Sequence, residues 1–164
     1  MSIDCGFWQG KQWFRYRAAA IIVEDGAVLF VGNAKENYYY SVGGGVHHGE
    51  TSLDAVRREV EEETGVRYEV DRLAVVHENF FDGEGGDYEG VECHEICFYY
   101  LMKPRGTRLL HSNSYTHEGL AEEMHWVPVA DLGKVRAYPS FLAEYLSAPH
   151  PEVVHVVTDD RKAR

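Results

Sequence analysis

The stretch from Thr51 to Gly65 constrains the fold of this chain most, because it carries the signals of a helix at both of its ends. Thr51 is a favourable N-cap, and Asp54 three residues later completes a capping box, so we expect a helix to begin at Ser52. Gly65 suits the left-handed backbone position that ends a helix. Apolar residues recur between the two ends at spacings of three and four, which gives the helix one buried stripe: Leu53, Val56 and Val60.

Three glutamates share a second face of this helix. Glu62 and Glu63 follow Glu59 by three and four residues, so their carboxylates lie on one side. Like charges at that spacing repel by a few tenths of a kcal/mol. Divalent Mg²⁺ or Mn²⁺ relieves the repulsion, because both ions prefer carboxylate oxygens and water as ligands. A solvated acidic surface is the ordinary alternative, and three glutamates without further context would favour it.

The context is a glycine-rich segment just before the helix, Val42–Val46. Its glycines permit positive φ and let a phosphate or a metal ion approach the backbone closely, so we expect a turn that leads from a strand towards the helix. Gly43, Gly44 and Gly45 are therefore candidates for substrate contact. Arg58 can pair with Glu50 across the junction of loop and helix, which would fix the conformation of the loop.

Gly44, Glu50 and the run Arg58–Val66 together resemble the signature box of the Nudix hydrolases at every defined position. The pattern is Gly, five free positions, Glu, seven free positions, and then Arg-Glu-apolar-free-Glu-Glu-free-Gly-apolar. The resemblance implies metal-assisted cleavage of a diphosphate linkage in a nucleoside diphosphate derivative. It also implies the α/β class, as a three-layer α/β/α sandwich with a mixed central sheet whose core covers roughly residues 14–148.

The resemblance further implies roles for single residues. Glu59, Glu62 and Glu63, with a Gly44 or Gly45 carbonyl, would hold Mg²⁺ or Mn²⁺, and Arg58 would support catalysis. A further acidic ligand outside the box is common in the family, and the candidates in order of preference are Glu118, Glu122 and Glu95. The general base is open between Glu59 and Glu118.

Arg17 is a candidate ligand of the substrate phosphates, because arginine suits that geometry, although arginines at strand ends are equally ordinary on surfaces. The substrate itself stays open among oxidised nucleoside triphosphates, dinucleoside polyphosphates and nucleotide sugars. Two other classes of function are weighed against hydrolysis. A non-catalytic ligand sensor of this fold would usually lack box glutamates, and an isopentenyl diphosphate isomerase would need a reactive cysteine beside the glycine loop.

Length, charge and cysteine content limit the partners. The 164 residues fit one domain, 1–164, and the net charge of −11 argues against a large nucleic acid or an anionic membrane surface as partner. Residues 1–20 lack the apolar stretch of a signal peptide. Cys5, Cys93 and Cys97 are too few for a disulfide framework, so we expect free thiols and a cytoplasmic protein. The aromatic N-terminus leaves a homodimer open.

The remaining elements are predicted from local patterns. A β-hairpin over residues 17–31 turns at Asp25-Gly26, and Pro139 begins an amphipathic helix. The long connection from Lys103 to Glu122 is expected to border the site. Further strands are expected at Tyr38–Val42, within Arg67–Phe81, and at Cys93–Met102, Glu123–Val129 and Val153–Val157, before a disordered tail over Asp159–Arg164.

Overall fold

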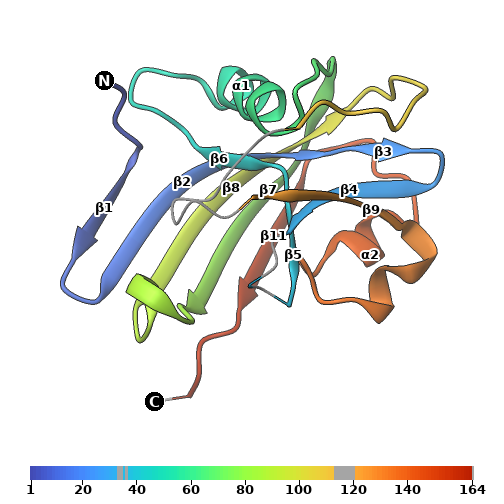
Figure 1. Ribbon diagram of the computed structural model, residues 1–164. Helices are drawn as coiled ribbons and strands as arrows, with labels where there is room; N and C mark the ends of the chain where they lie inside the picture. Colours follow the sequence, from blue (N-terminus) through green and yellow to red (C-terminus); the bar gives the residue numbers. More distant parts are fainter. Residues whose placement is uncertain (33–34, 36, 113–120, 164) are drawn as a thin grey trace.

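The computed structural model describes residues 1–32, 35, 37–112 and 121–163, and it contains two β-sheets with a helix on either side (Figure 1). The elements in chain order are β1 (Gly6–Gln9), β2 (Gln12–Ile21), β3 (Val23–Glu24), β4 (Ala27–Gly32), β5 (Tyr39–Ser41), β6 (Gly43–Gly45), α1 (Ser52–Thr64), β7 (Val70–Asp82), η1 (Gly86–Tyr88), β8 (Glu92–Met102), β9 (Glu123–Pro128), η2 (Val129–Lys134), β10 (Ala137–Tyr138), α2 (Leu142–Tyr145) and β11 (Val154–Asp159).

Both sheets are mixed. The first runs in the order β1-β2-β8-β7-β11, with β6 as a further partner of β2. Within it β2 and β8 are parallel, as are β7 and β11, whereas β7 and β8 are antiparallel. The second runs in the order β10-β5-β4-β3, with β9 paired to β4. After β2 the chain therefore passes directly into the second sheet. It returns from β5 to the first sheet through β6.

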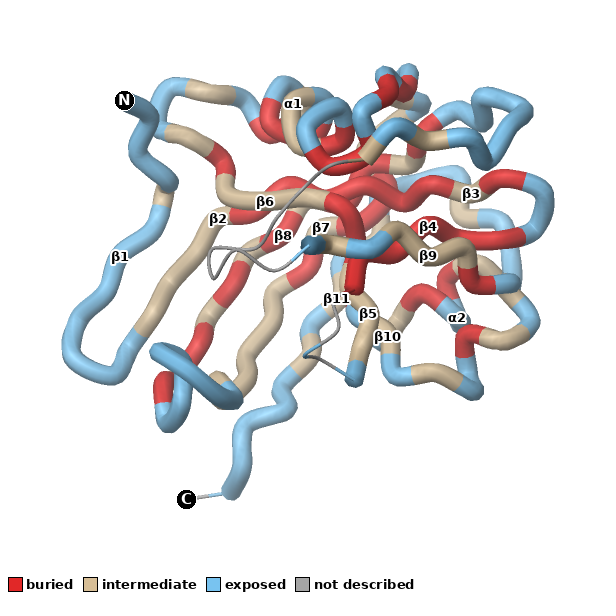
Figure 2. The backbone as a smooth tube through the Cα atoms, in the orientation of Figure 1, coloured by how far each residue is buried: buried red, intermediate tan, exposed pale blue. Residues whose placement is uncertain are grey.

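Two apolar clusters cover opposite sides of the sheets. Alternate residues of a strand face opposite ways, so Ala20 joins the cluster beneath α1 while its neighbour Ile21 joins the cluster beside α2. Figure 2 shows that burial is continuous along β4 and that β1 is exposed throughout. The helix α1 adds Ala55, Val56 and Val60 to the first cluster, and α2 adds Leu142 and Tyr145 to the second. The predicted three-layer α/β/α arrangement is confirmed.

The helix α1 begins and ends where its sequence signals predict. The Thr51 Oγ1 accepts a hydrogen bond from the Asp54 N–H at 3.1 Å and donates one to the Asp54 carboxylate at 2.7 Å. Gly65 follows the last turn with φ of 70°, and its N–H donates to the Glu61 carbonyl at 2.9 Å. These caps satisfy backbone groups that a helix end leaves unpaired. They fix the ends of the helix that carries the acidic face.

The predicted hairpin over residues 17–31 is only partly present. Its turn is as expected, because Asp25 and Gly26 have φ of 46° and 72°. Its first arm is not, since β2 pairs along its whole length with β8 and only Val23–Glu24 pairs with β4. The prediction was wrong about this arm because its partner strand lies about eighty residues later in the chain, where local turn chemistry gives no signal.

The run Gly43–Gly45 is a short strand, β6, and not the turn that its glycines predicted. It lies antiparallel to β2. Gly43 has φ of 153°, and a Cβ at this position would lie 2.3 Å from the Ala18 carbonyl oxygen. Glycine is needed here because two backbones approach closely, which is a different use of the same residue.

The helix predicted to begin at Pro139 is shorter than expected, since α2 spans Leu142–Tyr145. The residues just before Pro139 form β10, which is parallel to β5. Only one helical turn follows before the chain leaves towards β11. The apolar pattern of this segment was thus a better guide to burial, because Leu142 and Tyr145 are both buried, than to helix length.

The C-terminal strand extends beyond its prediction. β11 runs from Val154 to Asp159, parallel to β7 at the edge of the first sheet. The following residues are not the disordered tail that we expected, since the Asp160 N–H donates to the Phe80 carbonyl and the Lys162 N–H donates to the Asp82 carboxylate. These bonds continue the contact with β7 past the end of the strand.

The connection that precedes β9 has no helix or strand over residues 103–112, and residues 113–120 lie outside the described part of the chain. The prediction that this connection borders the acidic helix face is therefore not tested over its second half. Where the chain is described, none of the helices has both the length and the apolar character of a membrane span.

Candidate active site

The acidic face of α1 lies against β6. A Cβ at Gly44 would lie 2.5 Å from the Glu59 carboxylate carbon, so this carboxylate rests directly on the glycine backbone. Any larger residue at position 44 would displace Glu59. The sequence candidates Gly44 and Glu59 are thus brought together. β6 also supplies the Gly43 N–H, which donates a hydrogen bond to Glu63 at 3.3 Å.

Arg58 joins the helix to the loop that precedes it. Its Nε donates to the Glu50 Oε1 at 2.9 Å, and its Nη2 donates to the Glu50 Oε2 at 3.0 Å and to the Gly45 carbonyl at 3.1 Å. The His47 N–H adds a bond to Glu50 at 2.9 Å. The hydrogen bonds from Arg58 hold the pKa of Glu50 at about 2. The predicted pair of Arg58 and Glu50 is present, and Arg58 also binds the Gly45 carbonyl of β6.

The same guanidinium reaches two of the candidate metal ligands. The Arg58 Nη1 donates to the Glu59 Oε1 at 2.5 Å and to the Glu62 Oε2 at 3.4 Å. Burial raises the pKa of Glu59, and Arg58 opposes that rise. The Glu62 side chain is 60% exposed, so this carboxylate can turn without breaking packing.

Glu63 is the least satisfied carboxylate of the cluster. Its Oε1 accepts one long bond, 3.3 Å, from the Gly43 N–H. Its Oε2 is buried without a hydrogen-bond partner among the described residues. Burial raises the pKa of Glu63 to about 8, the neighbouring charges of Glu122 and Glu59 add to the rise, and Arg17 opposes it. A buried carboxylate left in this state costs free energy that an added cation would recover.

The two described candidates for a further acidic ligand lie in different surroundings. Glu122 accepts a hydrogen bond from the Tyr40 hydroxyl at 3.3 Å and acts electrostatically on Glu63. Glu95 is buried and bonded to the Arg15 guanidinium, with an Nε distance of 2.8 Å. Burial alone would raise the pKa of Glu95, but the adjacent arginines lower it below its ordinary value. The first choice of the sequence analysis, Glu118, lies outside the described residues.

Arg17 is buried and does not face solvent, being only 7% exposed. Its Nη2 donates to the Ser41 carbonyl at 2.7 Å, and its Nη1 lies 3.9 Å from the Cys97 sulfur. Its role as a ligand of substrate phosphates stays a prediction, and in this conformation the guanidinium is committed to protein acceptors.

The residues present fit a divalent cation. The donors are carboxylates beside a backbone strand, one of their oxygens is buried and unpartnered, and Gly44 leaves room that a side chain would fill. In the described part of the chain no three acidic, histidine or cysteine side chains already surround a common ion position. In this structure Arg58 contacts both Glu59 and Glu62.

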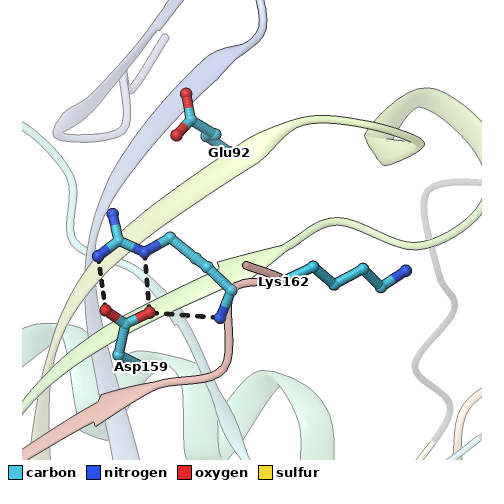
Figure 3. Close-up of a pocket in the computed structure, with 4 residues that line it drawn as sticks. Glu92, Asp159 and Lys162 are labelled. Atoms are coloured by element: carbon cyan, nitrogen blue, oxygen red, sulfur yellow. Dashed lines mark hydrogen bonds and ion pairs between the residues drawn. The ribbon is translucent and has the colours of Figure 1, made fainter. Parts of the chain in front are cut away.

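A second region of charge lies away from α1, near the C-terminus. A cavity of about 430 Å³ is lined by Glu92, Asp159, Arg161 and Lys162 (Figure 3). Arg161 donates to both oxygens of Asp159, as the dashed lines in Figure 3 mark. Two of the four charged side chains that line this cavity, Asp159 and Arg161, are therefore paired with each other.

Sequence reasoning missed two participants in the site, Tyr40 and Ser41. Tyr40 holds Glu122, and the Ser41 carbonyl accepts from Arg17. The available signal was position, because both residues immediately precede the glycine run. Their roles depend on β5 lying beside the acidic cluster, which no local pattern reveals.

A sequence model described as the NUDIX domain matches residues 14–148 of the chain. A MutT-like protein from Streptomyces ambofaciens is 40% identical over 62 residues, which are 38% of this chain and 40% of that protein. The match thus spans less than half the length of that relative.

Two solved structures are similar over most of their length. A MutT NUDIX hydrolase from Burkholderia pseudomallei has a TM-score of 0.59 and 23% identity, covering 79% of this chain and 95% of that chain. The MutT protein from Methanosarcina mazei Go1 has a TM-score of 0.61 and 16% identity, covering 85% and 94%. At these identities the likeness shows the fold alone.

Proposed function

This chain belongs to the Nudix family, and we propose that it is a pyrophosphohydrolase that cleaves the diphosphate linkage of a small nucleoside diphosphate derivative with the help of Mg²⁺ or Mn²⁺. Nudix hydrolases generally use divalent cations and act on small nucleotide derivatives. The observation that carries the proposal is the buried, unpartnered Oε2 of Glu63 beside Glu59 and the glycine strand. Such a group is explained by an ion that arrives with the substrate.

The chain offers a ligand set and a frame for it. Glu59, Glu62 and Glu63, with the carbonyl of Gly44 or Gly45, would hold the cation. When bound, the ion would neutralise the diphosphate oxygens and lower the pKa of the attacking water. Arg58 keeps Glu50 and the Gly45 carbonyl in place, so the strand that faces the phosphates does not have to reorganise.

Two further tasks fall to residues near this cluster. A carboxylate must accept the proton of the attacking water, and Glu59 and Glu118 are the candidates for this general base. Glu118, Glu122 and Glu95 are the candidates for a further acidic ligand. Glu122 is supported by its action on Glu63, whereas Glu95 is already bonded to Arg15. The backbone of Gly43, Gly44 and Gly45 would contact the phosphates.

We also propose that residues 1–164 act as a single domain. We further propose a cytoplasmic location, which the free thiols of Cys5, Cys93 and Cys97 support. The expected partner is a small molecule. The net charge of −11 speaks against large nucleic acids and anionic membranes. A homodimer through the exposed aromatic residues Phe7 and Trp8 is a proposal of lower rank.

The test is a panel of nucleotide sugars, dinucleoside polyphosphates and oxidised nucleoside triphosphates, assayed for phosphate or nucleotide release with Mg²⁺ and with Mn²⁺. Turnover of at least one class, abolished by chelation, is expected. Binding of a nucleotide without turnover would indicate a sensor, and conversion of isopentenyl diphosphate would indicate an isomerase. Wild-type rates in excess chelator would contradict the metal requirement.

The same assay assigns the further carboxylate. Glu118→Gln or Glu122→Gln should lower kcat with little change in KM if that residue acts only in the transition state. A strong effect at Glu122 with none at Glu118 would give the ligand role to Glu122. If both variants keep the wild-type kcat, Glu59 carries the base role alone.

A further inference from the structure

Arg17 is a buried cation, only 7% exposed, and it lies where three parts of the structure meet. It is a residue of β2, its Nη2 bonds to the Ser41 carbonyl at the end of β5, and its Nη1 lies near Cys97 of β8. A buried guanidinium is retained only where its acceptors are well placed, because its desolvation is expensive. The arginine therefore links both sheets at one point.

That point is next to the acidic cluster. Arg17 lies opposite Gly45 in the pairing of β2 with β6, and Ala19 lies opposite Gly43. The carbonyl that Arg17 holds belongs to Ser41, two residues before Gly43. The Gly43 N–H in turn is the single described donor to Glu63. A chain of contacts thus runs from the guanidinium through Ser41 and the glycine strand to the Glu63 carboxylate.

The charge of Arg17, like its contacts, links it to Glu63. Arg17 acts favourably on the Glu63 carboxylate, whereas Glu59 and Glu122 act against it. The positive charge of Arg17 is also balanced by Glu95, which lies close enough to interact with it. An incoming cation would therefore meet little net repulsion from this arginine.

We propose that Arg17 is a positioning residue, which holds the Ser41–Gly43 backbone and the Glu63 carboxylate in the arrangement that receives the divalent cation. It does not contact the substrate phosphates. This inference rests on the proposed function for the identity of the ligand, and it replaces the phosphate-contact role predicted from sequence. The two roles differ in what a substitution changes, because a phosphate ligand sets KM while a positioning residue sets cation affinity and kcat.

The experiment compares Arg17→Met with Arg17→Lys and a matched control, Arg15→Met. Arg15 lies two residues earlier on the same strand face, and its loss removes the hydrogen bonds that it donates to the buried Glu95, whereas the bond to the Ser41 carbonyl comes from Arg17. Each variant is measured by thermal melting, by Mn²⁺ binding followed through the EPR signal of free Mn²⁺, and by kcat and KM well below its melting temperature.

Arg17→Met should weaken Mn²⁺ binding about tenfold and lower kcat by roughly ten- to a hundredfold, with KM within about twofold, as expected when a group that supports metal ligands is removed. Arg17→Lys keeps a donor and a charge, so it should recover part of the Mn²⁺ affinity. Arg15→Met should melt earlier yet keep the wild-type Mn²⁺ affinity and kcat.

A rise in KM alone would overturn the proposal in favour of a phosphate contact. Equal behaviour of Arg17→Met and Arg15→Met would overturn it in favour of a role in stability only. The Mn²⁺ measurement uses no substrate, so it tests Arg17 even if the wild-type protein hydrolyses nothing in the substrate panel. Failure of this proposal and failure of the proposed hydrolysis are therefore distinguishable.

Discussion

Glu50 and Glu63 lie at opposite ends of the helix α1, and their carboxylates have opposite surroundings. Glu50, just before the first turn, accepts two bonds from Arg58 and one from the His47 N–H, and its pKa is held at about 2. Glu63, in the last turn, accepts one long bond and keeps one buried oxygen unpartnered, and burial raises its pKa to about 8. One carboxylate is fully satisfied by the protein and the other is not.

This difference indicates that Glu50 has a structural role in the site, whereas Glu63 is available for its chemistry. A carboxylate that already accepts several hydrogen bonds stabilises the loop and has little capacity left for a ligand. An unsatisfied one lowers the stability of the metal-free protein and reserves its oxygen for a cation. Substitutions of Glu50, Glu63 and Arg58 test this difference between the two carboxylates.

The largest effect is expected from Glu63→Gln on turnover. The amide keeps the shape but removes the negative charge, so kcat should fall by about a hundredfold or more, which corresponds to about 2.7 kcal/mol. Glu61→Gln is the control, because Glu61 lies on the same helix but pairs with Arg67 at the surface. Equal rates for the two variants would place the ligand role elsewhere.

Arg58→Ala should lower both stability and activity. The variant loses two bonds to Glu50 and one to the Gly45 carbonyl, so the free energy of unfolding should fall by about 2–3 kcal/mol. Arg57→Ala is matched in type and position, but Arg57 has only a 3.7 Å ion pair with Asp54 at the surface. Thermal melting and kcat are measured for both variants. A larger loss of stability and kcat for Arg57→Ala than for Arg58→Ala would contradict the supporting role assigned to Arg58.

Sequence alone predicted the satisfied half of this comparison well. Thr51, Asp54 and Gly65 act within a few residues of themselves, and the pair of Arg58 and Glu50 spans one loop, so short-range spacing was enough. The ends of α1 and the ion pair beside it could therefore be predicted without knowledge of the fold.

The unsatisfied half could not be predicted in the same way. The burial of Glu63 depends on β6 lying against α1, and that of Arg17 depends on β2 pairing with β8, about eighty residues away. Arginine suits phosphate geometry, which suggested a phosphate ligand at position 17, whereas the structure buries the Arg17 guanidinium. Likewise, nothing local in the sequence shows that Glu122 acts on Glu63, because Glu122 lies just before β9, which pairs with β4 in the second sheet.

A smaller effect is expected from Glu63→Gln on metal-free stability, and it should depend on pH. The folded pKa, about 8, lies above the ordinary value of 4.5, so the folded state holds the proton more tightly than the unfolded state. Wild-type stability is therefore complete below about pH 4.5 and declines as pH rises towards 8. The variant lacks this decline, and at pH 8 it should be more stable by on the order of 2 kcal/mol. Denaturant unfolding in chelator at both pH values measures this, and excess Mg²⁺ should reverse the order at pH 8.

The smallest effect is expected from Glu50→Gln, with the opposite dependence on pH. The hydrogen bonds from Arg58 depress the folded pKa of Glu50 to about 2, below the ordinary value of 4.5. Its contribution is therefore complete above pH 4.5 and is lost as pH falls through about 2. Because the pair is partly open to solvent, the variant should lose on the order of 1 kcal/mol at pH 7. Wild type and variant should converge near pH 2, and the difference should shrink in high salt. Denaturant unfolding along a pH series checks this, and a difference between the two proteins that grew on acidification would show that Glu50 and Glu63 do not differ in the way that their contacts imply.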